Sequence, residues 1–362
     1  MHSSFSAFRL LATIAACLAL VVIVLGAWVR LSAAGLGCPD WPGCYGHLTA
    51  EGAARNVDAI SQAFPQRPFE YAKAAKEMVH RYFASALGLL IVVLAGIAIV
   101  NRKVPQQPVT LPVVLVGLVI LQGLLGMWTV TLLLKPLIVV LHLLGGLATL
   151  SLLTWLAMKP PARSLRGHKV DEDAPDEPSS VAAAPSSSLL AAGPASRQKS
   201  GLIRKLAQFG LVVLVVQIAL GGWTSSNYAA LACPDFPTCQ NAYWPDMDFK
   251  GAFVLWRGLG IDYEGGVLDH PARVAIHFTH RLGAVLSALM LGWLSVLAWR
   301  KGGSSRVRTA ALAVGVVLIV QLVLGPLMVE RAFPLSLATA HNAVAALLLV
   351  AIVRLNRLLV KP

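Results

Sequence analysis

The sequence predicts an all-α integral membrane protein whose eight transmembrane helices form two pseudo-symmetric four-helix bundles in tandem. Two observations carry the membrane assignment. Hydrophobic residues make up 57% of the 362 positions and charged residues only 13%, with a mean hydropathy of +0.70, a composition typical of membrane proteins. The apolar residues also gather in eight runs, each close to the roughly 20 residues that a helix needs to cross the hydrocarbon core. The runs cover residues 10–29, 78–100, 111–131, 137–157, 206–224, 274–299, 309–329 and 336–355.

A repeated motif supports the division into two halves. Cys38-Pro-Asp-Trp-Pro-Gly-Cys44 returns 195 positions later as Cys233-Pro-Asp-Phe-Pro-Thr-Cys239. Two histidines keep nearly the same interval, with His80 repeated as His280 and His142 as His341. A duplication of a whole four-helix unit explains these intervals, and because each unit begins on the same side, the two are expected to be parallel.

The domain boundaries follow from composition. Residues 1–158 form the first four-helix half and residues 204–362 the second. The segment between them, 159–203, is rich in Pro, Ser, Ala and charge without apolar periodicity. Such a composition predicts a disordered cytoplasmic linker.

Charge predicts the orientation of the chain. With eight spans, the termini and the even-numbered loops share one side, which carries 18 of the 30 basic residues and 5 of the 17 acidic ones. The positive-inside bias places both termini in the cytoplasm and both cysteine loops outside. The net charge of +13 is therefore a topology signal, and we expect the lipid bilayer, not nucleic acid, as the partner.

Four histidines have a shared position, each within about two turns of the outer end of an even-numbered span. Ionisable residues inside spans are costly and usually functional. If each half packs as a bundle, His80 can face His142, and His280 can face His341, as axial ligation of a haem iron requires. Histidines that only hydrogen-bond between helices are the alternative, and zinc is disfavoured because no compact tetrahedral ligand set is present.

The residues around the histidines differ between the halves. Glu77 lies three positions before His80 on the same helix face, whereas His277 takes this position in the second half. A carboxylate beside one haem could relay protons, or it could simply meet water at the interface. Arg81 and Arg281 follow the histidines and are candidates to pair with haem propionates or with lipid phosphates.

Each cysteine pair encloses five residues and two prolines, so disulfides Cys38–Cys44 and Cys233–Cys239 are plausible in an outer compartment. Each bridge could be a structural staple over its bundle or a redox pair that exchanges electrons. The staple is favoured for the second pair, and both readings stay open for the first.

Together, the two four-helix halves, one histidine on each even-numbered span, Glu77-x-x-His80-Arg81 and the Cys-Pro-Asp-Trp-Pro-x-Cys loop resemble the bacterial haem A synthase family. The resemblance covers the chain apart from the linker. It implies oxidation of the C8 methyl group of haem O to a formyl group, making haem A for haem-copper terminal oxidases. It implies that His80 and His142 bind substrate haem O with Glu77 as a catalytic carboxylate.

For the second half, the resemblance implies a haem b cofactor held by His280 and His341. The first cysteine pair is linked to activity in this family, and the second is thought to stabilise its loop. Haem O synthase, a farnesyltransferase, is implied as the supplier of substrate. Cytochrome oxidase assembly factors, an unidentified electron donor and a homo-oligomer are further possible partners, and the bacterial inner membrane is the implied location.

Three other functions stay open on the residues alone. A di-haem b electron-transfer protein and a haem transporter would use the same histidines without modifying haem. A membrane thiol oxidoreductase would use the cysteines, but their spacing differs from the Cys-x-x-Cys of such enzymes. Bis-histidine ligation also raises a mechanistic question, since a six-coordinate substrate iron has no open position for oxygen.

Overall fold

The computed structural model describes residues 2–105, 107–158 and 194–360. In this part of the chain, eight helices are long and apolar enough to cross a membrane, which confirms the predicted spans. They are α1 (His2–Leu31), α4 (Tyr71–Val100), α5 (Thr110–Thr131), α6 (Pro136–Ala157), α7 (Pro194–Ser226), α9 (His270–Lys301), α10 (Ser305–Glu330) and α11 (Leu335–Leu359). The protein is therefore a multi-pass membrane protein.

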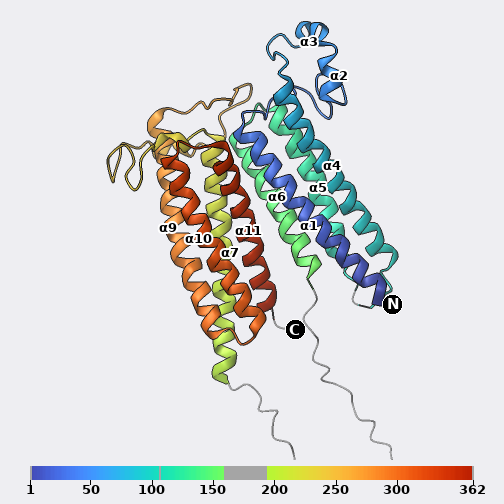
Figure 1. Cartoon of the computed structure of the whole chain (residues 1–362), viewed down its shortest axis with the longest axis vertical. Coiled ribbons are helices and arrows are strands. Elements are labelled where there is room, and N and C mark those ends of the chain that lie inside the picture. The colour runs from blue at the N-terminus through green and yellow to red at the C-terminus, as the bar shows by residue number, and fades with distance from the viewer. Residues whose placement is uncertain (1, 106, 159–193, 361–362) are drawn as a thin grey trace, which may run out of the picture.

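The eight long helices form two bundles that stand side by side (Figure 1). In the first, α1, α4, α5 and α6 contact one another in a ring, so that α4 and α6 face each other diagonally across the centre. In the second, α7, α9, α10 and α11 form the same ring, with α9 and α11 on the diagonal. The even-numbered spans of the sequence are thus the diagonal helices of each bundle.

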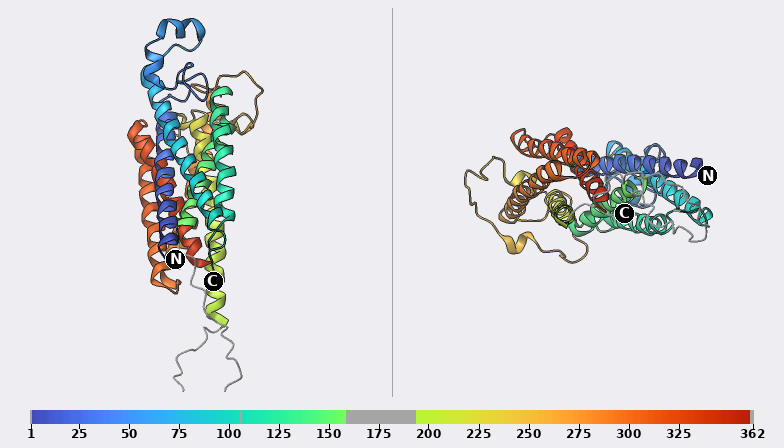
Figure 2. Two further views of the ribbon diagram at one scale, coloured as in Figure 1. Left: turned by 90° about the vertical axis from the view of Figure 1, so that its right-hand side faces the viewer. Right: turned by 90° about the horizontal axis from the view of Figure 1, so that it is seen from below.

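The halves meet along α1 and α6 of the first bundle and α7 and α11 of the second. The view from below shows the two bundles side by side (Figure 2). One apolar cluster includes buried residues from all eight helices, among them Leu94, Leu153, Leu294 and Ile352. The two halves therefore share a continuous core.

The repeat extends to the backbone of the turns. Leu133 and Leu134, between α5 and α6, both have positive φ angles of 51° and 59°. Ala332 and Phe333, between α10 and α11, repeat this pair with 54° and 58°. Because non-glycine residues rarely adopt positive φ, the shared conformation supports the duplication of a whole unit.

The loops that carry the cysteines lie at one end of the molecule, opposite the end where α1 begins and α11 ends (Figure 1). The first loop contains two short helices, α2 (Ala50–Ala54) and α3 (Val57–Ala63). The second contains a 3₁₀ turn, η1 (Ala230–Ala232), and α8 (Phe249–Ala252). Thr49 caps α2 by accepting a hydrogen bond from the backbone amide of Gly52, at 3.0 Å.

Two boundaries differ from the sequence-based expectation. Helix α4 begins at Tyr71, before the apolar run that starts at Met78, because the Ala-rich turns ahead of the run continue the helix. Of the linker predicted over residues 159–203, residues 159–193 lie outside the described part of the chain. Residues 194–203 belong to α7.

Candidate functional site

The first pair of histidines meets across the centre of the first bundle. His80 lies in the third turn of α4 and His142 in the second turn of α6. Their ring centroids are 6.5 Å apart and their planes are nearly perpendicular, at 85°. A metal–imidazole bond is about 2 Å and the bonding nitrogen lies about 1 Å from its ring centroid, so two imidazoles on one metal have centroids about 6 Å apart. The pair therefore fits a single metal atom between the rings.

A glycine on a neighbouring helix faces each of the four histidines. A Cβ atom added at Gly26 would lie 3.0 Å from the His80 ring, and one added at Gly221 would lie 3.1 Å from the His280 ring. Gly126 and Gly325 take the same place beside His142 and His341, at 3.4 and 3.7 Å. These glycines create the space in which each imidazole lies, a role that the sequence analysis missed although Gly26 and Gly221 occupy matched positions.

The second pair of histidines occupies the equivalent helices. His280 lies in α9 and His341 in α11, on the diagonal of the second bundle. Each is contacted by a glutamine: Gln217 Nε2 is 3.1 Å from His280 Nδ1, and Gln321 Nε2 is 3.0 Å from His341 Nε2. The structure thus places the four predicted ligands in two diagonal pairs, one per half.

Glu77 is buried, with 6% of its side chain exposed. Its Oε2 accepts a hydrogen bond from the backbone amide of Cys38 at 2.9 Å, and its Oε1 accepts one from Arg81. The carboxylate therefore joins the helix that carries His80 to the loop that carries the first disulfide. It does not simply meet water at the interface.

His277 takes the position of Glu77 in the second half but makes a different contact. Its Nε2 faces Arg281 Nε at 3.4 Å, and its ring packs against Phe333. Because a guanidinium only donates hydrogen bonds, the facing nitrogen of His277 must be an acceptor. His277 is therefore a structural neighbour of Arg281.

Arg81 and Arg281 both hold the cysteine loops. Arg81 Nη1 donates to the carbonyl oxygens of Asp40, Pro42 and Gly43, at 3.0, 3.2 and 2.5 Å. Arg281 repeats this arrangement through three carbonyl oxygens of the second loop, those of Cys233, Asp235 and Thr238. In the structure these arginines bind backbone, a use that the sequence analysis did not foresee.

The cysteine pairs form the disulfides Cys38–Cys44 and Cys233–Cys239, with S–S distances of 2.04 and 2.00 Å. All four cysteines are buried. Cys38 lies directly against Glu77 through its backbone amide. The first disulfide is therefore adjacent to the carboxylate that distinguishes the two halves.

The aspartate of each cysteine motif closes its own loop. Asp40 accepts hydrogen bonds from the backbone amides of Tyr45 and Gly46, at 2.5 and 2.7 Å. Asp235 accepts from the Thr238 hydroxyl and from two backbone amides. The hydrogen bond from Thr238 is the main cause that holds the pKa of Asp235 below its usual range, and the hydrogen bonds from the backbone amides lower it further. This capping role explains why aspartate occurs in both copies of the motif.

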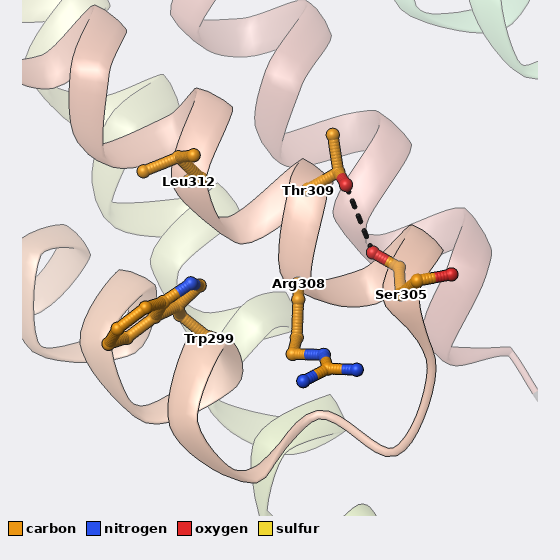
Figure 3. A pocket seen from close by; sticks show the side chains of 5 residues that line it. All are labelled: Trp299, Ser305, Arg308, Thr309 and Leu312. Carbon is orange, nitrogen blue, oxygen red and sulfur yellow. Dashed lines mark hydrogen bonds between the residues drawn. The ribbon is translucent and has the colours of Figure 1, made fainter.

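A pocket lies beside the turn between α9 and α10, and Figure 3 shows the side chains that line it. Its lining residues are Trp299, Ser305, Arg308, Thr309 and Leu312. Trp299 follows His280 by about 28 Å along α9, at 1.5 Å per residue. The pocket is therefore separate from the histidine sites.

Within the described residues, no three His, Cys, Asp or Glu side chains gather into a metal-binding cluster. The two diagonal helices of each bundle instead supply one imidazole each. A pair of imidazoles suits a metal whose remaining ligands come from a flat macrocycle. The fold and these sites define a class: a membrane protein of two four-helix halves, each with a histidine pair near the end covered by a disulfide-closed loop.

Comparison with known proteins identifies the family within that class. The model of the COX15-CtaA family, described as cytochrome oxidase assembly protein, matches residues 9–353. The chain belongs to this family.

Individual relatives agree with the family match. The haem A synthase of Shewanella oneidensis is 40% identical over 337 residues, covering 93% of this chain and 92% of that protein. The haem A synthase of Caulobacter vibrioides is 27% identical and covers 93% and 91%. A shorter alignment of 108 residues relates the chain to the protoheme IX farnesyltransferase of Halobacterium salinarum. It is 32% identical and covers 30% of this chain and 19% of that protein.

Proposed function

We propose that the protein is a haem A synthase, an oxidoreductase that converts the C8 methyl group of haem O to a formyl group. The observation that carries the proposal is the asymmetry of two otherwise matched histidine sites. Only the first site has a buried carboxylate, Glu77, three residues before its ligand His80. The 40% identity to a haem A synthase over most of both chains supports the same conclusion.

In this proposal the first half binds the substrate haem O through His80 and His142. The iron of the bound haem supplies the redox chemistry. Two successive oxygenations of the methyl group use two molecules of dioxygen, four electrons and four protons and release two waters; the resulting geminal diol then loses a third water to give the formyl group. Protons must therefore be delivered beside the first site. Glu77 is the acidic group on the same helix face as His80, so we assign it the role of relaying them.

Two contacts prepare Glu77 for proton transfer. The Cys38 amide and Arg81 both donate to the carboxylate and so stabilise its charged form. Arg81 also fixes the loop above it through three carbonyl oxygens. The carboxylate is thereby held in a single place relative to His80, as a proton relay requires.

In the second half, His280 and His341 would hold a haem b cofactor, which would supply electrons for the reaction at the first site. No carboxylate is needed there, which is consistent with His277 at the position of Glu77. We place the protein in the bacterial inner membrane, with both termini cytoplasmic and the disulfide loops outside. A farnesyltransferase that makes haem O is the expected supplier. The electron donor and the assembly factors that take up haem A are further partners of this proposal.

The test is the haem content of the purified wild type and of Glu77→Gln, measured by solvent extraction and chromatography after expression with a source of haem O. We expect haem A in the wild type. We expect haem O or a hydroxylated intermediate in the variant, because an amide cannot relay protons. Glu70→Gln, which removes a carboxylate from an exposed ion pair with Lys73, is the matched control and should produce haem A. If the wild type contains haem b alone, the protein is an electron-transfer cytochrome and the proposal is wrong.

A further inference from the structure

We propose that the turn at Tyr243 and Trp244 in the second cysteine loop docks on the lipid bilayer, at the boundary between the hydrocarbon core and the headgroups. The partner of this exposed aromatic surface is the membrane in which the protein lies, not a second protein. The second cysteine loop then has a membrane-binding role in addition to the haem chemistry of the proposed function.

Two neighbouring aromatic side chains project from the second loop. Tyr243 is 78% exposed and Trp244 is 73% exposed, more than any other aromatic side chain in the described part of the chain. Cys239 and Ala242 exchange backbone hydrogen bonds of 2.9 and 3.2 Å just before them. No charged residue occurs between positions 236 and 245. The turn therefore holds both rings outward on a hydrogen-bonded base, and moving it into a less polar phase desolvates no charge.

Trp244 continues the lipid-facing surface of α9. Its ring packs edge-to-face against Phe278, with the centroids 5.4 Å apart and the planes at 80°. Phe278 shares a helix face with exposed apolar residues at helical spacing further along α9. These residues are Leu282, Val285, Leu289, Trp293 and Val296. The aromatic turn is therefore contiguous with the surface that α9 presents to the hydrocarbon.

The length of this surface sets the depth of the turn. Phe278 lies about 27 Å before Val296 along α9, at 1.5 Å per residue, close to the hydrocarbon thickness of about 30 Å. Residues 299–301, with the sequence Trp-Arg-Lys, follow at the far end, as is typical of a membrane interface. On the near side, residues 274–277 are all buried in the protein. Trp244 therefore lies at the level where the hydrocarbon ends, which is where Trp and Tyr rings are favoured.

The first half lacks this aromatic pair. Thr49 takes the place of Trp244, 195 residues earlier, and caps α2. Met78 takes the place of Phe278, 200 residues earlier, and is buried in an apolar cluster that includes residues of α2. Figure 1 shows the same difference, because α2 and α3 rise above the helix ends whereas the second loop spreads sideways beyond α9. Docking through an aromatic pair is thus expected of the second loop.

The experiment places one nitroxide label at a time on the full-length protein, in a Cys17→Ala background, in vesicles of phosphatidylcholine and phosphatidylglycerol. The labelled variants are Tyr243→Cys, Leu289→Cys as the lipid control, and Gln62→Cys, exposed on α3, as the water control. Power saturation of the EPR signal compares the accessibility of each label to oxygen, which concentrates in lipid, and to a water-soluble nickel chelate. We expect the oxygen-to-nickel ratio at position 243 to be several-fold higher than at position 62 and lower than at position 289.

Substitution of Trp244 in the Tyr243→Cys protein tests the anchor. Trp244→Ser should lower the ratio toward that of position 62, because serine has neither the interfacial preference nor the ring contact with Phe278. Trp244→Phe keeps the ring contact and should change the ratio less. Equal nickel accessibility at positions 243 and 62 would overturn the inference. Shielding of position 243 from both reagents, with dipolar broadening between labels, would assign the turn to a contact between copies of the chain and would also overturn it.

Discussion

At the scale of single residues, the two halves agree in their histidine pairs and differ in what surrounds these pairs. His80 and His280 each lie against a glycine of the preceding long helix. The residue three positions before each of these histidines is Glu77 in one half and His277 in the other, and the two make different contacts. A duplicated scaffold can therefore support two sites with separate tasks, because single polar side chains decide proton and ligand chemistry locally.

The glycines beside the histidines lead to a residue-scale prediction. Gly26→Val should lower the haem content of the purified protein about fivefold or more, because the new methyl groups would overlap the His80 ring and overpacking costs about 1–3 kcal/mol. Pyridine haemochrome spectra measure this content.

Gly96→Val is the matched control. Gly96 is an exposed glycine of α4 with nothing within 4 Å of an added Cβ. Wild-type haem content in Gly26→Val would show that the glycine does not make room for the ligand.

At the scale of elements, the long helix that follows each cysteine loop also anchors that loop. Arg81 of α4 and Arg281 of α9 each donate hydrogen bonds to three carbonyl oxygens of the motif. The disulfide closes the loop. The arginine, which follows the histidine by one residue, joins the loop to the helix through hydrogen bonds. Loop and ligand therefore hold a constant relative position.

Arg81→Leu is expected to release the first loop. It removes the charged donor from three carbonyls and leaves Glu77 buried beside the Cys38 amide alone, a loss of about 3 kcal/mol or more. Limited proteolysis should then cut the first loop faster than in the wild type.

Lys73→Ala breaks the exposed pair with Glu70 and should change the cleavage rate little, since such pairs contribute about 0–1 kcal/mol. Equal cleavage rates for Arg81→Leu and the wild type would contradict the anchoring role of Arg81.

At the scale of the whole molecule, the ends of the two bundles that carry the cysteine loops are joined by polar contacts. Lys135, from the turn between α5 and α6, is buried. Its ammonium lies 3.7 Å from the ring centre of Trp256 and donates to the carbonyl oxygen of Gly258. Arg67 of the first loop pairs with Asp262 and Glu264 of the second, at 2.5 and 2.7 Å. The loops at this end therefore form one joint cover over both halves.

Lys135→Ala should reduce the free energy of unfolding by about 2 kcal/mol, because it removes a desolvated cation–π contact and leaves a carbonyl oxygen unpaired. Thermal unfolding of the detergent-purified protein, followed by tryptophan fluorescence, measures the change. Arg67→Ala, whose ion pairs are partly exposed, should have the smaller effect, about 1 kcal/mol or less. The reverse order of the two variants would argue against Lys135 as the main link between the loops.

The proposed orientation can be tested by labelling in a Cys17→Ala background. Leu259→Cys, in the exposed part of the second cysteine loop, should react with a membrane-impermeant maleimide in intact spheroplasts. Gly303→Cys, between α9 and α10, should react only after the membrane is permeabilised. Labelling in the opposite order would invert the assignment of both termini to the cytoplasm.

The sequence by itself determined the eight spans, the duplication and the matched positions of the four histidines. Hydrophobic length and residue intervals are local properties that survive without knowledge of packing. Only the tertiary structure decided that α4 faces α6 and α9 faces α11 diagonally. It also decided that Glu77 binds the Cys38 amide, that Arg81 holds loop carbonyls, and that Gln217 reaches His280. These contacts join residues far apart in the chain, and their distances depend on how the helices rotate and pack, which no spacing in the sequence specifies.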